Sequence, residues 1–349
     1  MTADGARGPG LLERLDAGAV VCAEGYLFEL ERRGYLQAGS FVPEVLLDHP
    51  EQVTSLHEQF VHAGSDVVEA LTYYAHREKL RVVGRDGQLE EMNRTALELA
   101  RDVADRTGAL LAGNVCNTNV FDPGDTATHD AARRMFDEQV GWAADAGCDY
   151  VIAETFRYAE EAQVALEAVR AAGLPVVVTL AVGSGGRTRE DWSVADACGR
   201  LADAGADVVG LNCLRGPATM LPLLPEVVDA VGVPVAALPV PYHTTPEEPT
   251  FHALRDPAGD GDGRPFPIGL DPFTCTREDV AAFTRDAHAA GVRYLGLCCG
   301  AAPHHVRSMA EALGRTPPAS RYSADMSKHA FFGTESGLSR HNLDYAPEL

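Results

Sequence analysis

The chain has 349 residues, with 29 Lys and Arg against 51 Asp and Glu, and therefore a formal net charge of −22. This acidic excess argues against a nucleic-acid partner or an anionic membrane surface, because both require clustered cationic side chains. Hydrophobic residues make up 46% of the chain, which is enough for a large core and is typical of a folded globular protein rather than a disordered one.

The hydropathy of the chain also bears on where the protein works. No apolar run approaches the ~18 residues of a spanning helix, and residues 1–18 lack the apolar stretch of a signal peptide. We therefore expect a cytoplasmic protein without a membrane partner. In that reducing compartment its eight cysteines should be thiols.

A short pattern, in which a helix is followed by Ala-Gly and an apolar strand, recurs along the chain. It occurs as HAGSDVVEAL at 62–71, DAGCDYVIAE at 145–154, DAGADVVGLN at 203–212 and AAGVRYLGLC at 289–298. Glycine takes the left-handed conformation past a helix end without steric penalty, and the β-branched residues that follow favour a buried strand. Each copy therefore predicts the end of a helix followed by a parallel strand.

Four more apolar runs bring the expected strands to eight. These runs lie at 20–22, 109–115, 175–182 and 234–240, with helical stretches at 91–106, 128–144, 160–172, 191–203 and 277–290. The strands are continuously apolar, as in a sheet covered on both faces. Eight βα units predict an α/β protein with a (β/α)8 TIM barrel. A doubly wound open sheet is the alternative, but AEGYLFELE after the first strand lacks a dinucleotide fingerprint, and GSGGR at 183–187 has the wrong glycine spacing.

Two irregular segments accompany the barrel, which we expect to span residues 1–315. The segment at 243–265 is rich in Pro, Gly and Asp, and we expect it to cover the mouth of the barrel. The tail at 316–349 begins TPPAS and is expected to be either partly disordered or an arm that packs on a partner subunit.

Chemistry in a TIM barrel is carried by side chains at the C-terminal ends of the strands. In chain order these ends supply Glu24, Thr72, Tyr73, Tyr74, the segment 114–119, Glu154, Asn212, Cys213, Tyr242, His243, Cys298 and Cys299. Three of the eight cysteines therefore meet at one mouth of the predicted barrel.

These three cysteines, Cys213, Cys298 and Cys299, are candidate metal ligands. Adjacent side chains of a strand face opposite ways, so Cys298 and Cys299 can reach one ion only where the strand ends, and Gly300 supplies that break. Three sulfur ligands favour Zn²⁺ and leave a fourth tetrahedral position open. Such a site suits an incoming thiol better than water, because three thiolates weaken zinc as a Lewis acid. The alternative is three buried thiols without a metal.

The other five cysteines show no such convergence, and we assign them to packing. They are Cys22, Cys116, Cys148, Cys198 and Cys275.

The motifs GLNC at 210–213 and CCG at 298–300 belong to a longer similarity that includes VIAETF at 151–156 and PYHT at 241–244. With these motifs the sequence resembles the homocysteine S-methyltransferase family, most closely its betaine–homocysteine branch. The resemblance implies that Cys213, Cys298 and Cys299 bind zinc and that Glu154 holds the amino group of homocysteine. It also implies methyl transfer from an onium donor to the zinc-bound thiolate, giving methionine, with no catalytic residue beyond the metal site.

The sequence departs from the betaine branch around the methyl donor. Glu24 stands one position beyond the aspartate of the family, and the Trp and Tyr of the betaine cage correspond to Phe41 and Thr155. These changes weaken an aromatic cage for a trimethylammonium group. We therefore expect a remodelled donor site, with other betaines or a sulfonium such as S-methylmethionine or dimethylsulfoniopropionate as donors to test beside glycine betaine.

Four neighbouring residues are further candidates for binding substrate. They are Thr72, Tyr73 and Tyr74 after the second strand, with Phe156 after the fourth. The expected partners are homocysteine and a small cationic methyl donor, for which an acidic mouth is compatible with the charge of −22. The resemblance of the tail to subunit-contact segments suggests a homo-oligomer, with a dimer as the expectation.

Other functions remain open from the sequence alone. A zinc-dependent hydrolase or lyase on the same barrel would need a general base, for which His243 or His304 could serve. Methyl transfer to a different small thiol and a non-catalytic barrel with structural cysteines are the remaining alternatives.

Overall fold

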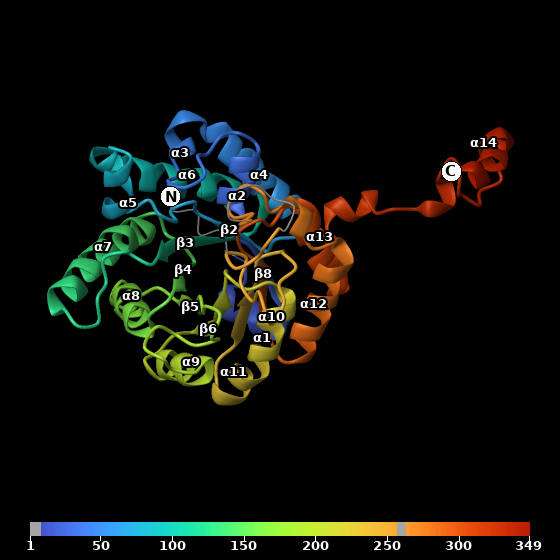
Figure 1. The fold of residues 1–349 in the computed structure, drawn as a ribbon. Helices are drawn as coiled ribbons and strands as arrows, with labels where there is room; N and C mark the ends of the chain where they lie inside the picture. The colour runs from blue at the N-terminus through green and yellow to red at the C-terminus, as the bar shows by residue number, and fades with distance from the viewer. Residues whose placement is uncertain (1–7, 257–262) are drawn as a thin grey trace.

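A computed structural model describes residues 8–256 and 263–349 of the chain (Figure 1). Its eight parallel strands follow the order β1-β8-β7-β6-β5-β4-β3-β2, with helices between them, and this confirms the predicted (β/α)8 barrel. The strands are β1 Val20–Ala23, β2 Val67–Glu69, β3 Leu110–Cys116, β4 Tyr150–Phe156, β5 Val176–Leu180, β6 Val208–Asn212, β7 Val235–Leu238 and β8 Tyr294–Leu297.

The barrel closes between β1 and β2 through one aspartate. The Asp66 backbone N–H donates to Val21 O at 2.8 Å, and the Asp66 carboxylate accepts from the Val21 N–H at 2.8 Å. Arg315 Nη1 lies 2.5 Å from the same carboxylate, so the closure is also held by a residue three positions beyond the end of the last barrel helix, at Ala312.

Most of the helices surround the sheet on its outer face, whereas α1 lies across one end of the barrel and α14 belongs to the tail. The α-helices of the described residues are α1 Leu11–Ala17, α2 Tyr26–Arg32, α3 Val45–Asp48, α4 Pro50–Ala63, α5 Arg77–Val82, α6 Leu89–Thr107, α7 Thr126–Asp145, α8 Ala159–Ala171, α9 Val194–Asp203, α10 Pro217–Met220, α11 Leu224–Ala230, α12 Arg277–Ala289, α13 Pro303–Ala312 and α14 Arg340–Tyr345. The five helices expected from the sequence correspond to α6, α7, α8, α9 and α12.

Most expected boundaries differ from the structure by one to three residues, and for two of them a local chemical reason is clear. Helix α9 begins at Val194 rather than 191, because the Ser193 hydroxyl caps it by accepting from the Asp196 N–H at 3.0 Å. Strand β7 ends at Leu238 rather than 240, because Pro239 has no N–H with which to continue the ladder.

Helix α1 closes the N-terminal end of the barrel. Its Leu11 and Leu15 belong to an inner apolar cluster that includes the first residue of several strands, among them Val20 and Tyr294. Tyr294 also meets Tyr150 inside the barrel, with their hydroxyl oxygens 2.9 Å apart. Because this end is filled, a substrate site is confined to the opposite mouth.

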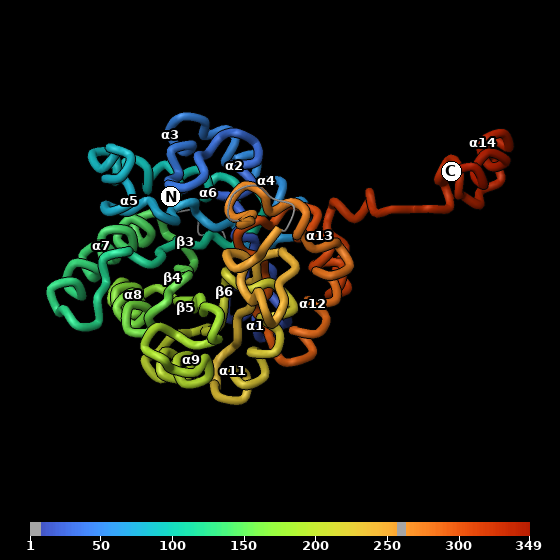
Figure 2. Tube along the Cα trace, viewed as in Figure 1, coloured from blue at the N-terminus to red at the C-terminus, as the bar shows by residue number. Residues whose placement is uncertain are grey.

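The segment after β7 folds over part of that mouth. Phe251 and Leu254 are buried, and the Phe251 N–H donates to Leu214 O at 2.8 Å. Of the loop predicted at 243–265, residues 257–262 lie outside the described residues. Figure 2 shows the described part passing beside α2, as expected for a cover.

The tail follows α13 and leaves the barrel as an arm that ends in α14 (Figures 1 and 2). Along it lie short 3-10 turns at Pro318–Tyr322 and Met326–Lys328.

Candidate metal centre and substrate site

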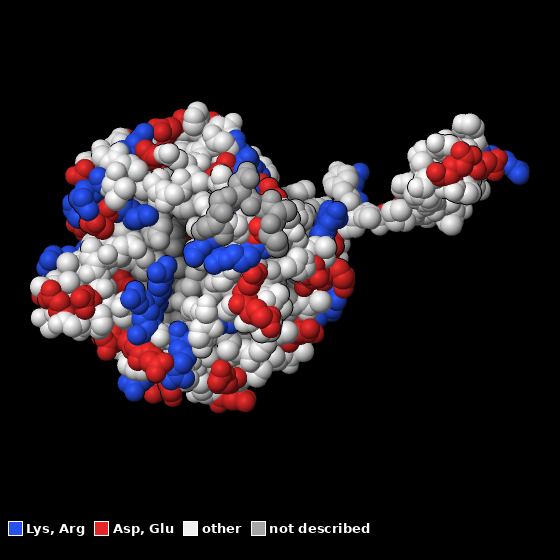
Figure 3. Space-filling view, viewed as in Figure 1, with Lys and Arg blue, Asp and Glu red and all other residues white. Residues whose placement is uncertain are grey.

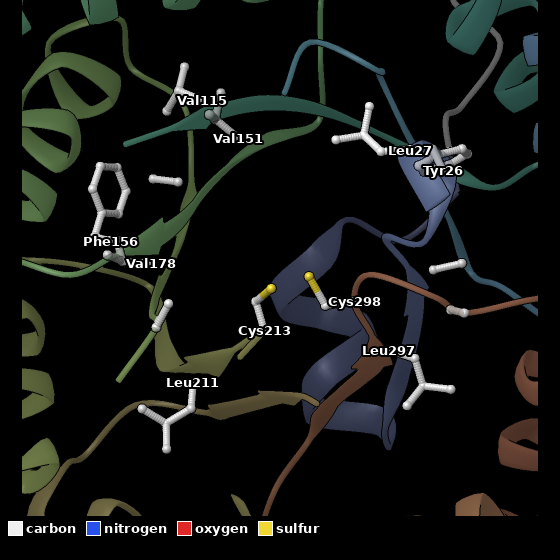
Figure 4. Packing of buried hydrophobic residues seen from close by; sticks show 14 of the residues in the cluster. Tyr26, Leu27, Val115, Val151, Phe156, Val178, Leu211, Cys213, Leu297 and Cys298 are labelled. Carbon is white, nitrogen blue, oxygen red and sulfur yellow. The ribbon is translucent and has the colours of Figure 1, made fainter. Parts of the chain in front are cut away.

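The sulfurs of Cys213, Cys298 and Cys299 lie within 4.8 Å of one another at the C-terminal mouth of the barrel. Figure 4 shows the side chains of Cys213 and Cys298 pointing toward each other. Cys213 Sγ is 3.8 Å and Cys298 Sγ is 3.9 Å from Cys299 Sγ. A tetrahedral zinc with Zn–S bonds of about 2.3 Å requires sulfurs about 3.8 Å apart. The three thiols therefore fit the donor set and the spacing of a Zn(Cys)₃ site.

The end of β7 holds the backbones of two of these cysteines. The Cys213 N–H donates to Leu238 O at 2.9 Å, and the Cys298 N–H donates to Pro239 O at 3.0 Å. The adjacent carbonyl groups of Leu238 and Pro239 thus hold Cys213, at the end of β6, close to Cys298, at the end of β8. Cys213 itself has a left-handed backbone with φ of 55°, a strained conformation that is common at functional sites.

Gly300 provides the break in β8 that directs two consecutive thiols to one place. Its φ is 97°, and a Cβ at this position would lie 2.3 Å from the hydroxyl oxygen of Tyr242. Only glycine fits both the conformation and the close approach.

Electrostatic interactions within the cluster concentrate negative charge on one thiol. Hydrogen bonds with Cys298 and Cys299 lower the pKa of the Cys213 thiol well below its usual value. The pKa values of Cys298 and Cys299 are raised by their interactions with Cys213. A thiolate flanked by two thiols favours a cation at their centre.

Three glutamates form an acidic wall beside the cysteines. Glu24, Glu69 and Glu154 are 8%, 2% and 3% exposed, and burial raises the pKa of each, that of Glu154 to about 7. One carboxylate oxygen of Glu24 and one of Glu154 lie within 4.8 Å of each other and of Cys298 Sγ. The shifted position of Glu24 therefore still directs its carboxylate to the cysteine cluster.

Two asparagine side chains hold Glu154 in place. Asn114 Nδ2 donates to Glu154 Oε1 at 2.7 Å and also to Glu69, while Asn212 Nδ2 donates to Glu154 Oε2 at 2.5 Å. Apart from the neighbouring Glu154 carboxyl, neither oxygen of Glu24 has a hydrogen-bond partner among the described residues. A buried carboxylate without a partner is costly, so the wall favours a cationic group of a ligand.

A small cavity connects the acidic wall with the cysteines. Its lining residues are Glu24, Tyr26, Leu27, Glu69, Ala70, Leu71, Tyr73, Glu154, Cys298 and Cys299. No histidine is among these described lining residues, and His243 lies elsewhere, 3.5 Å from Asp279 on α12. His304, on α13, lines an outer groove with residues of α4.

The predicted residues after β2 take different positions. Tyr73 lines the cavity, whereas the buried Thr72 hydroxyl donates to Asn114 O at 2.7 Å and ties β2 to β3. The ring of Tyr74 lies 4.4 Å from that of Tyr73, and one of its faces is covered by Lys79 Nζ at 4.0 Å.

The other three candidates for donor binding, Phe41, Thr155 and Phe156, lie in different environments. Thr155 is buried, and its hydroxyl donates to Glu154 Oε2 at 3.0 Å, which makes it a support for the acidic wall. Phe41 stacks on Phe28 with ring centroids 5.1 Å apart. Phe156 is fully buried against Phe136 of α7 and points away from the cysteines (Figure 4), so it belongs to the core between helix and sheet.

Sequence reasoning missed Glu69 and gave no role to Asn114 and Asn212. The signal was present as single polar residues within apolar runs, in VVEAL for Glu69 and in GLNC for Asn212. A polar residue buried at a strand end needs partners, and here the partners are one another.

Comparison with known proteins gives consistent results. A family model described as homocysteine S-methyltransferase matches residues 4–313. S-methylmethionine–homocysteine S-methyltransferase BHMT2 of Mus musculus is 37% identical over 338 residues, covering 95% of this chain and 88% of its own. Betaine–homocysteine S-methyltransferase 1 of Bos taurus is 37% identical over 350 residues, covering 95% of this chain and 80% of its own.

A solved structure shares the fold. The homocysteine methyltransferase MmuM from Escherichia coli, in its metallated form, superposes with a TM-score of 0.67 at 19% identity, covering 85% of this chain and 98% of that one. Within the described residues, no helix has the length and apolar character needed to cross a membrane.

Proposed function

The chain belongs to the homocysteine S-methyltransferase family, and on that premise we propose that it transfers a methyl group from an onium donor to the sulfur of homocysteine, giving methionine. The observation that carries this proposal is the convergence of three cysteine sulfurs on a cavity whose other wall is made of buried carboxylates. The sulfurs suit a metal that receives a thiol, and the carboxylates suit the ammonium group of the same amino acid.

Cys213, Cys298 and Cys299 are the residues that would hold zinc. A bound zinc ion lowers the pKa of an incoming thiol, so that homocysteine reacts as a thiolate at neutral pH. Loss of the thiol proton would then not require a general base from the protein.

The acidic wall binds and orients the acceptor. Glu24 and Glu154 accept hydrogen bonds from the homocysteine ammonium, while Asn114 and Asn212 fix the carboxylate of Glu154. Charge-assisted hydrogen bonds of this kind are the stronger ones in proteins. The apolar side chains of Leu27 and Leu71 exclude water from the reacting sulfur.

Methyl transfer requires correct positioning more than proton transfer. The sulfur lone pair forms the new S–CH₃ bond, the bond from methyl to the onium nitrogen or sulfur breaks, and the leaving group departs neutral with that electron pair. When the protein holds the two reactants in line, less entropy is lost on reaching the transition state. The activation free energy of methyl transfer is therefore lower.

We propose two classes of onium compound as the methyl donor, betaines and sulfonium compounds. Relatives named for betaine and for S-methylmethionine are equally similar to the chain, at 37% identity. Phe41 and Thr155 stand where the betaine branch has a larger aromatic cage, which supports testing dimethylsulfoniopropionate and S-methylmethionine beside glycine betaine.

The test is methionine formation by the zinc-loaded protein with homocysteine and each of these donors. We expect one zinc per chain and turnover with at least one donor. Cysteine in place of homocysteine tests a different thiol acceptor. Hydrolysis of a donor in the absence of any thiol would contradict the proposal and favour a zinc hydrolase or lyase.

We also propose that the tail from residue 316 is an oligomerisation arm that packs on a second copy of the chain as a dimer. Tyr322, Phe332 and Leu349 are 68%, 57% and 67% exposed, a large apolar surface for an isolated arm. The eight free thiols support a reducing, cytoplasmic setting.

A further inference from the structure

A second cavity, of about 270 Å³, opens at the mouth of the barrel and carries arginines in place of carboxylates. It is lined by Arg157, Ala181, Gly183, Ser184, Arg187, Arg189, Leu214, Thr250 and His252. Figure 3 shows Lys and Arg side chains gathered around the hollow at the centre of this face. On a chain with a net charge of −22, such a concentration of cationic groups is unexpected.

Two of the three arginines have no carboxylate partner among the described residues. Arg187 Nε pairs with Asp191 Oδ1 at 2.7 Å. Arg189 instead places its guanidinium 5.0 Å from the ring centroid of Tyr158. The Arg157 side chain makes no ion pair or hydrogen bond in the described part of the chain, although its charge acts on the buried Glu161 carboxyl. The donors of Arg157 and Arg189 are therefore available to an anion.

The backbone around the cavity is fixed by hydrogen bonds. Arg215, only 6% exposed, donates from Nη2 to Gly183 O at 2.6 Å and to Ser184 O at 2.9 Å. The Arg189 N–H donates to Arg157 O at 2.9 Å, which joins the two unpaired arginines through their main chains. Hydrogen bonds thus fix the conformation of the loops after β4 and β5 that form the cavity.

The arginine cavity adjoins the metal centre, since His252 in its lining lies close enough to both Cys213 and Arg157 for their charges to shift its pKa. Leu214 lines it and directly follows Cys213, while Arg157 stands two residues after Thr155, a backbone span of at most about 7 Å. The two cavities have no lining residue in common. The cysteine cluster therefore has residues of a carboxylate-lined cavity and of an arginine-lined cavity close by.

We propose that the arginine cavity binds the anionic end of the methyl donor and so selects zwitterionic onium compounds that carry a carboxylate. This inference rests on the proposed function. The acceptor occupies the acidic cavity, and the donor must reach the sulfur from the opposite side for an in-line transfer. Guanidinium groups bind carboxylates through paired hydrogen bonds, so Arg157 and Arg189 would fix the donor with its onium group toward the cysteines.

The test compares acid and neutral forms of the same donors. Wild type, Arg157→Gln and Arg189→Gln are assayed with glycine betaine and dimethylsulfoniopropionate, and with the amide of each. We expect the KM of the acids to rise about 10- to 100-fold in the variants, because a hydrogen bond between charged groups is lost. The amides should be used equally by all three proteins, and the KM of homocysteine should not change.

Arg133→Gln is the matched control, since Arg133 pairs with Asp137 at 2.8 Å on α7, outside both cavities. It should leave every KM unchanged. If Arg157→Gln and Arg189→Gln raised the KM of acid and amide donors equally, the proposal would be overturned. A rise confined to the KM of homocysteine would also overturn it, because the arginines would then bind the acceptor.

Calorimetric titration of each donor into the zinc-loaded protein with homocysteine keeps the test independent of turnover. Tighter binding of the acid than of its amide, lost in Arg157→Gln, would support the arginine site even if no methionine forms. Absence of methyl transfer from every donor would contradict the proposed function alone, whereas equal affinities for acid and amide would contradict the arginine site alone.

Discussion

Cys213 Sγ lies 3.8 Å from Cys299 Sγ, although 86 positions separate the two residues along the chain. The barrel brings them together because the ends of β6 and β8 both reach the end of β7. This contact and the neighbouring Cys298 define the centre on which the proposed chemistry depends.

Replacing one thiol of the centre should remove the metal. In Cys298→Ala we expect zinc to fall from one per chain to below about 0.1, with methionine formation reduced at least about 100-fold, because even changes outside the ligand set cost 10- to 100-fold in metal affinity. Metal analysis by mass spectrometry and a methionine assay measure both. Cys198→Ala, a buried cysteine on α9, should retain zinc. Full zinc in the Cys298 variant would exclude this metal site.

Substitutions of Glu24 and Glu69 in the acidic wall should weaken homocysteine binding to different extents. Among the described residues Glu24 has only the Glu154 carboxyl as a partner, whereas Glu69 already accepts a hydrogen bond from the Asn114 amide. We expect Glu24→Gln to raise the KM of homocysteine about 10-fold or more and Glu69→Gln to change it less. Initial rates at varied homocysteine measure this, and the reverse order would assign the ammonium to Glu69.

The close packing of Gly300 on Tyr242 should couple the two residues. Gly300→Ala forces a Cβ against the Tyr242 hydroxyl and should cost about 1–3 kcal/mol of stability as well as zinc occupancy. Tyr242→Phe removes the hydroxyl, so the double variant should recover part of both losses. Urea unfolding and zinc analysis provide the measurements, and additive losses in the double variant would contradict the coupling.

His57 should make stability fall toward acidic pH. It is fully buried on α4 with its ring 4.9 Å from Tyr26, and burial lowers its pKa to about 3. Because the folded pKa is lower than the unfolded value of about 6.5, the unfolded state binds the proton more tightly. The contribution of His57 to the free energy of unfolding is therefore fully present above about pH 6.5 and is lost as the pH falls toward 3. Between pH 7 and pH 5 we expect the free energy of unfolding to decrease by about 2 kcal/mol because of this group.

His57→Phe keeps a ring against Tyr26 but cannot be protonated. Urea unfolding at pH 7 and 5 should show a smaller loss in this variant than in wild type. His49→Gln, a change at an exposed histidine, serves as the control and should leave the loss intact. An unchanged pH dependence in His57→Phe would show that other groups are responsible.

Deleting the arm after residue 322 should produce a folded monomer. The deletion removes Phe332, Tyr345 and Leu349, which are exposed on the isolated chain, but leaves the barrel and α13 intact. Light scattering coupled to size-exclusion chromatography should give a dimer for the full chain and a monomer for the deletion, with unchanged circular dichroism. A monomeric full chain would contradict the proposed role of the tail.

The strand pattern and the family motifs were sufficient to predict the barrel and to nominate its cysteine cluster. Continuously apolar runs indicate strands buried on both faces, and the residue that follows each run lies at the mouth whatever the details of packing. Cys213, Cys298 and Cys299 could therefore be nominated together from their positions after β6 and β8, and the structure places their sulfurs within 4.8 Å.

The direction of individual side chains was decided only by the tertiary structure. Glu154 and Phe156 stand two positions apart on β4, so a regular strand would point both to the same face. A register shift between Ala153 and Phe156, with Thr155 at a φ of 63°, instead turns Glu154 into the cavity and Phe156 toward α7. A bulge of this kind leaves no periodic signal in the sequence.

The arginine cavity has the same origin in tertiary structure. Arg157 follows β4, whereas Arg187 and Arg189 belong to the loop after β5, and neither segment carries a motif that pairs them. Net charge is a sum over the whole surface, so a value of −22 cannot show where the cationic groups gather. Sequence thus determined the barrel and the strand ends, while the folding of the loops decided which charges face each substrate.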